Sequence, residues 1–342
     1  MLTITANHVA ITSLSILLAT CGCLARIGLI ELSTYNNAPF PASLYSNVLG
    51  CFVASLIPTI LGSYFSTLAA TIVIAFSGSL TTFSAWMVET SSLLGNYSNT
   101  EHYSGRNVLS GLAFFFSYPA ITFASLILGY QLGMVLTKAT PLKKWHNKYN
   151  SKDDTFKFSR TAASILSIFS LLVIVMFLLL VILYKANRHI TLSALLSPVG
   201  AFFRYGLLVL FNNYYSPTAP LEGSKKHAVT WRAIGKRAFQ YKGTLYANLI
   251  ATVIAALCYI FMYKINSRIS PTACWSLYGI SNGLAGTLST FSTFAKEVYL
   301  IIPPSYVEIV EVKRDSQHIR PDGVVVYDVD EDMRSTVGSA AA

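Results

Sequence analysis

The sequence predicts an all-α membrane protein built from two inverted-topology repeats, with four helices in the first repeat and three recognisable helices in the second. Two observations lead to this prediction. Of the 342 residues, 53% are hydrophobic and only 12% are charged, whereas about a quarter of the residues in a soluble domain are charged. In addition, three short blocks of the first half recur in the same order in the second half, which indicates an internal repeat.

Apolar segments recur along the chain at about the length of roughly 20 residues that a helix needs to cross a bilayer. The first segment lacks the charged start and the cleavage site of a signal peptide, so it counts as a span. Eight spans are expected, over residues 9–33, 42–62, 67–90, 107–137, 161–184, 190–211, 242–263 and 273–302.

The distribution of basic residues predicts the orientation in the membrane. Lysines and arginines concentrate between residues 138 and 160 and between residues 225 and 242. Loops rich in these residues face the cytoplasm, so the N-terminus is expected there too, as in a multi-pass plasma-membrane protein. The loop 91–106 would then lie outside, where it carries a possible glycosylation site at Asn96. Because the net charge of +10 resides in these loops, it does not indicate nucleic-acid binding.

The repeated blocks fall on corresponding spans of the two halves. They pair Gly22–Leu29 with Gly200–Leu207, Ser43–Asn47 with Thr244–Asn248, and Gly78–Glu89 with Gly286–Glu297. The strongly apolar span 161–184 has no counterpart in the repeat. A single connecting span of this kind inverts the orientation of the second half in the membrane relative to the first. Inverted repeats place a transport pathway at their interface, although a duplicated bundle without a pathway remains an alternative.

These blocks divide the chain into four parts. Residues 1–137 form the first repeat and 138–189 the basic loop with the linker helix. Residues 190–302 form the second repeat, in which the fourth span is missing, and 303–342 form a polar tail that is expected to be disordered, with at most a short strand in "VVVYDV".

The polar residues of the repeated blocks are candidates for function. Arg26 and Arg204 occupy matching first spans, where each is either a residue that reaches the membrane interface or part of a basic vestibule. Asn47 and Asn248 occupy matching second spans, where each amide either bonds a neighbouring helix or lines a pore.

The matching third spans contain "SGSLTTFSAW" (Ser77–Trp86) and "AGTLSTFSTF" (Ala285–Phe294). Glycine and hydroxyl residues weaken a helix, and unpaired backbone at membrane depth is tolerated only against protein or water. We therefore expect the third helix of each repeat to be broken. The phenylalanine that follows each break offers a positively polarised ring edge to a small anion, although such residues also serve in ordinary packing.

An arginine in the first helix, an asparagine in the second and a G-x-x-T-T-F-S-T-F break in the third resemble the fluoride channels of the Fluc/CrcB type. The tandem arrangement resembles the eukaryotic fluoride export proteins, in which two four-helix halves and one linker helix form a monomeric pseudo-dimer. The resemblance covers residues from about 9 to 300. It implies passive fluoride export that confers fluoride resistance, with fluoride ion and the lipid bilayer as partners.

The resemblance also implies roles for individual residues. Trp86 stands where the second phenylalanine of the first half would be, so the selective aromatic pair is expected in the second half. A hydroxyl rail is expected one turn apart on the fourth helix. The implied fluoride pore comprises Asn47, Asn248, Phe83, Phe291, Phe294, Thr82, Thr290, Tyr118 and Thr122, and the vestibule Arg26 and Arg204. A structural sodium ion would be held by the backbone carbonyls of Gly78, Thr81, Gly286 and Ser289.

Other functions remain open. The missing last span favours a non-conducting homologue that serves as a membrane scaffold, and the broken helices are also compatible with a sodium-coupled carrier of small solutes. An enzyme is not expected, because the six histidines are scattered over loops and span ends and none is paired with a nucleophile. The five cysteines fit buried small residues better than a metal site.

Overall fold

The computed structural model describes residues 5–35, 38, 40–61, 65–95, 104–138, 158–184, 187–212, 241–264, 270–301, 317–319 and 325–327. The first repeat contains α1 (Ala6–Ser33), α2 (Ala42–Leu61), a broken third helix and α6 (Ser104–Lys138). The linker is α8 (Arg160–Leu183), and the second repeat contains α9 (Arg188–Phe211), α11 (Lys242–Lys264) and a second broken helix. Residues 139–157 and 225–240 of the predicted basic loops, Asn96 and most of the tail lie outside the described residues.

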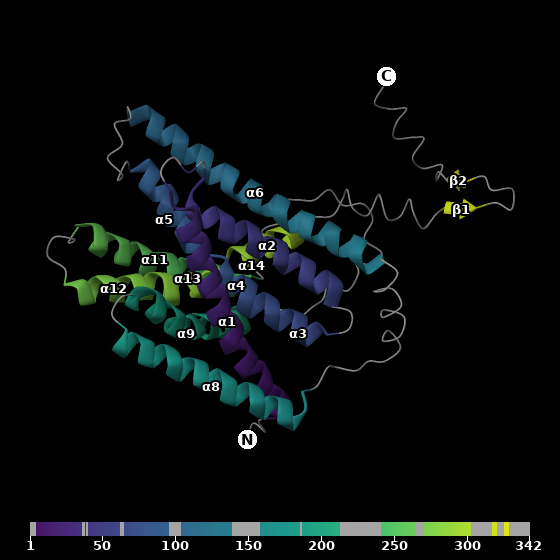
Figure 1. Cartoon of the computed structure of the whole chain (residues 1–342). Helices are drawn as coiled ribbons and strands as arrows, with labels where there is room; N and C mark the ends of the chain where they lie inside the picture. The colour runs from purple at the N-terminus through teal and green to yellow at the C-terminus, as the bar shows by residue number, and fades with distance from the viewer. Residues whose placement is uncertain are drawn as a thin grey trace.

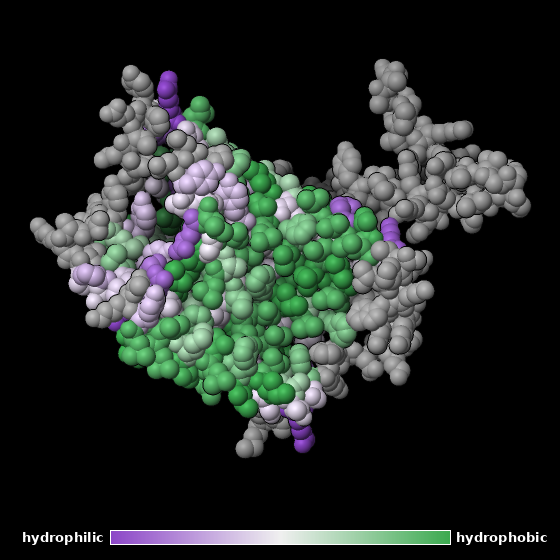
Figure 2. Space-filling model, viewed as in Figure 1, coloured by the Kyte–Doolittle hydropathy of each residue, from purple (hydrophilic) through white to green (hydrophobic). Residues whose placement is uncertain are grey.

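Seven helical segments of the described chain are long and apolar enough to cross a membrane, and they coincide with the first seven predicted spans. The chain is therefore a multi-pass membrane protein. Figure 2 shows a broad apolar surface over the helices, with hydrophilic side chains towards its edges. The eighth predicted span, 273–302, is helical over Pro271–Ile301 with one interruption, but it is not among these seven apolar segments.

Both third helices are broken at matching residues, as the sequence predicts. The first consists of α3 (Ser66–Thr71), a π-helical segment η1 (Ile72–Ser77), α4 (Gly78–Leu80) and α5 (Phe83–Leu94). The second consists of α12 (Pro271–Gly279), the π-helical η2 (Ile280–Ala285), α13 (Gly286–Leu288) and α14 (Phe291–Ile301). Thr81 (φ −92°, ψ 149°) and Ser289 (φ −79°, ψ 151°) are extended. At each of these residues the backbone leaves the helix, and it becomes helical again two residues later.

The bundle is arranged around α1 and α9. Figure 1 shows α1 crossing its middle, with α2 and α6 on one side and α9 and α8 on the other. The linker α8 packs on both α1 and α9 and leaves most of its side chains exposed on the outer surface, as expected for an apolar linker helix. The helix α14 of the second half crosses to α2 and α6 of the first half, and α5 crosses to α11 in the same way.

The two halves differ in what covers their second helix. In the first half, α6 runs along α2. Within the described residues no helix packs on α11 in the corresponding manner, and Leu249, Val253 and Ile260 of α11 are 59%, 52% and 49% exposed. In the tail, β1 (Gln317–Ile319) pairs antiparallel with β2 (Val325–Tyr327), which lies inside the predicted "VVVYDV" strand.

Candidate functional site

Each buried arginine binds the broken helix of the other half as well as its own. Arg26 donates from Nη1 to the carbonyls of Ser79 (2.8 Å) and Gly286 (2.5 Å) and from Nη2 to the carbonyl of Asn282. Backbone carbonyls are the usual partners of a charge at membrane depth. Because the Arg26 side chain is only 1% exposed, the alternative of a residue that reaches the interface does not fit.

Arg204 of the second half makes the equivalent contacts, with the roles of the two halves exchanged. It donates from Nη1 to the carbonyls of Gly78 (2.7 Å) and Thr287 (2.6 Å) and from Nη2 to the carbonyl of Ile74, and it is also 1% exposed. In the repeat register, Gly78 corresponds to Gly286, Thr287 to Ser79 and Ile74 to Asn282. This exchange of equivalent partners is what an approximate two-fold relation between the halves requires.

Two glycines make room for the guanidinium groups. A Cβ atom on Gly78 would lie 2.5 Å from Nη2 of Arg204, and one on Gly286 would lie 2.5 Å from Nη2 of Arg26. Any larger residue at either position would displace the arginine. The glycine that begins each repeated third block is therefore explained by close approach of a charged side chain.

Each predicted asparagine closes its own break by a two-point hydrogen bond. Asn47 accepts from the backbone N–H of Thr82 (2.7 Å) and donates to the Thr82 carbonyl (2.9 Å). Asn248 makes the same pair with Thr290, at 2.7 Å and 3.1 Å. Both side chains are buried. The amide thus replaces the intrahelical bonds that the break removes, which explains its position one turn inside the second helix.

Hydroxyl groups of each break cap the helix that follows the other break. The Thr81 Oγ1 accepts from the backbone N–H groups of Phe291 (3.3 Å) and Ser292 (3.2 Å). Its counterpart, Ser289 Oγ, accepts from the N–H of Ser84 (3.3 Å) and bonds the Ser84 hydroxyl (2.9 Å). The two breaks therefore meet, as predicted, and each satisfies the free N–H groups of the other helix start.

The predicted aromatic residues of both halves converge on one cluster beside α2 and α6. Phe291 lies with its ring centroid 6.1 Å from that of Phe83, 5.6 Å from that of Phe294 and 5.7 Å from that of Tyr118. The rings of Phe83 and Phe294 meet edge to face at 5.2 Å. Phe291 of the second half thus lies against Tyr118 and Phe83 of the first half, and Phe294 lies against Phe83.

Trp86 fills the part of this cluster where the resemblance implies a phenylalanine. Its ring stacks on Phe115 and Tyr118 at 5.1 and 5.9 Å and meets Phe83 and Phe291 edge to face at 5.1 and 5.5 Å. Its indole N–H has no hydrogen-bond partner among the described residues. The larger ring is accommodated by packing against α6, at the expense of an unpaired donor.

Tyr118 connects this aromatic cluster to the polar residues of α2. Its hydroxyl lies 2.6 Å from Nδ2 of Asn47, which donates to it, and 2.9 Å from Oγ of Ser43. Thr122, one turn further on, donates instead to the carbonyls of Tyr118 and Pro119 in its own helix. Only Tyr118 of the predicted hydroxyl rail therefore contacts a polar group of α2 through its side chain.

A carboxylate in each half, the half-buried Glu89 and the buried Glu297, extends the polar track, and the sequence did not predict a role for it. Ser43 donates to Oε2 of Glu89 (2.5 Å), and Thr244 donates to Oε1 of Glu297 (2.5 Å). Glu89 and Glu297 are the last residues of the matching third blocks, and Ser43 and Thr244 the first of the matching second blocks. The comparison of the two repeats could have predicted this pair, because both halves have a carboxylate and a hydroxyl residue at equivalent positions.

The predicted sodium site fits the structure poorly. Two of its four carbonyls, those of Gly78 and Gly286, accept hydrogen bonds from Arg204 and Arg26. A cation there would be repelled by both guanidinium groups at short range.

The site gathers neutral polar groups and ring edges. The N–H and O–H hydrogens of Asn47, Ser43 and Tyr118 already bond Thr82, Glu89 and one another, so a small anion would have to displace some of these bonds. Hydroxyls of Ser43 and Tyr118, the Asn47 amide and the edges of Phe83, Phe291 and Phe294 lie within one contiguous cluster. Several modest donors can replace a hydration shell without holding the ion too tightly. In the second half Asn248 and Thr244 lack the tyrosine contact, since nothing in the described chain occupies the place of α6.

The sequence of the chain agrees with one membrane-protein family over both repeats. The family model described as CrcB-like protein, Camphor Resistance (CrcB), matches residues 13–130 and 191–310. The two matches cover the two repeats and more than half of the chain, so the chain belongs to the CrcB-like family.

Individual relatives bear names that specify an ion. Fluoride export protein 1 and Fluoride export protein 2 of Schizosaccharomyces pombe are each 31% identical to this chain over 123 residues, which are 34% of this chain and 40% of each relative. Fluoride-specific ion channel FluC 1 of Lactobacillus delbrueckii subsp. bulgaricus is 35% identical over 66 residues, 19% of this chain and 48% of the relative. The matched part thus spans less than half the length of these relatives. No solved structure matches the chain.

Proposed function

We propose that this chain is a passive channel that lets fluoride leave the cell and thereby confers fluoride resistance. The observation that carries the proposal is the cluster in which Tyr118 of the first half, bonded to Asn47, meets Phe291 of the second half, which in turn packs on Phe294. The names of the relatives and the family membership support fluoride as the ion. No bond of the ion is made or broken, so we propose no enzymatic activity.

The pathway that we propose runs along α2, α6 and α14. Its donors would be the Asn47 amide and the hydroxyls of Tyr118 and Ser43, which exchange their present bonds for the ion, and its ring edges come from Phe83, Phe291 and Phe294. A membrane potential contributes about 2.3 kcal/mol per elementary charge for each 100 mV, so an inside-negative potential expels the anion. The matching pathway along α11 lacks a counterpart of α6 among the described residues, which favours one pore over two.

The setting of this channel is part of the proposal. We place it in the plasma membrane with a cytoplasmic N-terminus, on the strength of the basic loops of the sequence. The reciprocal contacts of Arg26 and Arg204 support a monomer that contains both halves of a pseudo-dimer. A sodium ion at the breaks stays a prediction, and with Gly78 and Gly286 bound to arginines no step of permeation is derived through it.

Fluoride efflux from liposomes tests the proposal directly. The purified chain is reconstituted in potassium-fluoride-loaded vesicles, and external fluoride is followed with a selective electrode after a potassium ionophore is added. We expect efflux that greatly exceeds chloride efflux and falls at least tenfold in Phe291→Ile. Phe203→Ile is the matched control, because Phe203 is 50% exposed on α9 outside the cluster. Equal fluoride and chloride rates would exclude a selective channel.

A second candidate function is a non-conducting homologue, and the uncovered face of α11 is the observation that favours it. The same experiment separates the two functions, because a non-conducting chain gives no efflux above empty vesicles. A sodium-coupled carrier would instead show fluoride or solute movement that depends on a sodium gradient and saturates with substrate.

A further inference from the structure

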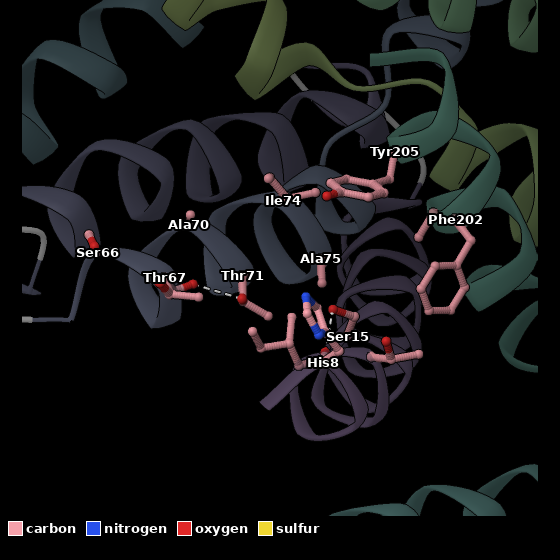
Figure 3. A pocket seen from close by; sticks show the side chains of 13 residues that line it. His8, Ser15, Ser66, Thr67, Ala70, Thr71, Ile74, Ala75, Phe202 and Tyr205 are labelled. Carbon is pink, nitrogen blue, oxygen red and sulfur yellow. Dashed lines mark hydrogen bonds between the residues drawn. The ribbon is translucent and has the colours of Figure 1, made fainter. Parts of the chain in front are cut away.

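A cavity of about 580 Å³ lies between α1, the α3–η1 segment and α9, apart from the proposed pathway (Figure 3). This volume falls within the roughly 300–1,000 Å³ range of small-molecule sites. None of the predicted pore or vestibule side chains lines it. Its walls include Ile11, Ile74, Ala75 and Phe202, which are apolar.

The two repeats differ at the residues that determine whether this space is filled. In the register that pairs Gly78 with Gly286, Thr67 and Ala70 of the cavity wall correspond to Trp275 and Tyr278 of the second half. Tyr278 packs edge to face on His189, with ring centroids 4.9 Å apart. Two aromatic rings therefore occupy the second half where the first half has only a threonine and an alanine.

Two glycines of the second half increase this difference in packing between the repeats. Gly279 and Gly283 lie so close to α9 that a Cβ atom would be 2.6 Å from Leu192 Cδ2 and from the Ser193 carbonyl oxygen, respectively. Their first-half counterparts, Thr71 and Ala75, carry side chains, and both line the cavity. The cavity thus follows from specific sequence differences between the repeats.

The chemistry of the cavity changes along its length. His8 lies in the first turn of α1 and Ser66 begins α3, so each polar residue stands at the start of its helix. Polar and aromatic residues at a helix end are typical of the membrane–water interface. Further along the cavity the wall is formed by Ile74, Ala75 and Tyr205, whose ring lies beside Ile74 (Figure 3).

The cavity opens on the outer surface of the bundle. Ser66 and Ala70 on its rim are exposed, and Phe202 is 38% exposed. The outer surface at this depth faces lipid in a membrane protein. We propose that this cavity binds one acyl chain of a bilayer phospholipid, with the glycerol and head group of the lipid at His8 and Ser66. The chain would pack on η1 beside Ile74, whose carbonyl holds Arg204.

A photoactivatable lipid tests this site without relying on fluoride transport. The full chain is reconstituted in phosphatidylcholine vesicles with a tracer that carries a diazirine on one acyl chain, and the labelled peptides are mapped by mass spectrometry. Ala70→Tyr copies the second half and should fill the cavity. We expect it to reduce labelling of α1, α3 and α9 at least fivefold. The matched control is Ala113→Tyr at an exposed position of α6, which should leave this labelling unchanged.

Equal labelling of the wild type and Ala70→Tyr would overturn the proposal. A second measurement excludes a water-filled vestibule and does not depend on how Ala70→Tyr folds. In a background with the exposed Cys21 and Cys274 changed to serine, Thr67→Cys should react at least tenfold more slowly with a charged thiol reagent than Thr5→Cys, which is at an exposed position. Similar rates would show a hydrated cavity and contradict lipid binding.

Discussion

Adding one methyl group at Gly78 should break the contact between the two halves. The Cβ of Gly78→Ala would lie 2.5 Å from Nη2, 2.8 Å from Cζ and 2.9 Å from Nη1 of Arg204. The guanidinium must move, and it then loses its bonds to the carbonyls of Gly78, Thr287 and Ile74. Removing the partners of a buried charge costs about 3–5 kcal/mol. We expect a loss of free energy of unfolding of that size.

The assay is denaturant unfolding of the purified protein in detergent micelles, followed by tryptophan fluorescence. Gly206→Ala is the matched control, because it also lies in a helix and nothing stands within 4 Å of its Cβ position. An alanine there should be neutral or stabilising by up to about 1 kcal/mol, since alanine favours the helix over glycine.

A double-mutant cycle identifies the cause of the destabilisation. The three atoms nearest to the added Cβ all belong to Arg204. In an Arg204→Ala background, Gly78→Ala should therefore cost less than about 0.5 kcal/mol, so that nearly its whole effect appears as coupling energy. If Gly78→Ala is as stable as the wild type, or costs the same with and without Arg204, the proposed role of the arginine in joining the halves is wrong.

Three further results are expected. Asn47→Leu and Asn248→Leu each lose two hydrogen bonds to the break and should each lose about 1–3 kcal/mol of stability. Fluoride efflux per folded protein should fall at least tenfold only in Asn47→Leu. Equal losses of efflux in the two variants would contradict a single pore. Thr81→Val and Ser289→Ala each remove a helix cap and should each cost about 1 kcal/mol in the unfolding assay, and no loss in either would exclude the capping role. Trp86→Phe gives up ring area but also an unpaired buried N–H, so its stability should change by less than about 1 kcal/mol; a loss above about 2 kcal/mol would show that the N–H is satisfied.

The repeated blocks predicted most of the architecture because the features they carry are local. Glycine and hydroxyl residues between Gly78 and Thr82 weaken a helix wherever they occur, so both breaks could be placed from the sequence. The apolar lengths likewise gave the spans. The π-helical segments η1 and η2 could not be predicted, since their extra backbone residue is accommodated by packing against α1 and α9 and leaves no periodic signal of its own.

Contact partners were harder to predict than positions. The sequence identified Arg26 and Arg204 as charged residues at membrane depth, but it could not show that each reaches the broken helix of the other half. The same holds for Phe291, which lies against Tyr118 of the first half. These contacts depend on how two inverted halves interlock. Only a position-by-position comparison of the repeats, for example Ala70 against Tyr278, contained an unused signal.

The exchanged contacts explain why the two halves can differ at the periphery while their centre stays alike. A separated first half would bury Arg26 without the carbonyls of Gly286 and Asn282, and the start of α5 would lose the cap from Ser289. The same holds for the second half, so changes at these central residues destabilise both halves together. The wall of the cavity at Ala70 and the covering of α11 take no part in these hydrogen bonds, and Trp86 contacts the other half only through its ring against Phe291 among the ring contacts described. Divergence there alters one pathway or one lipid-facing surface and leaves the joint between the halves intact.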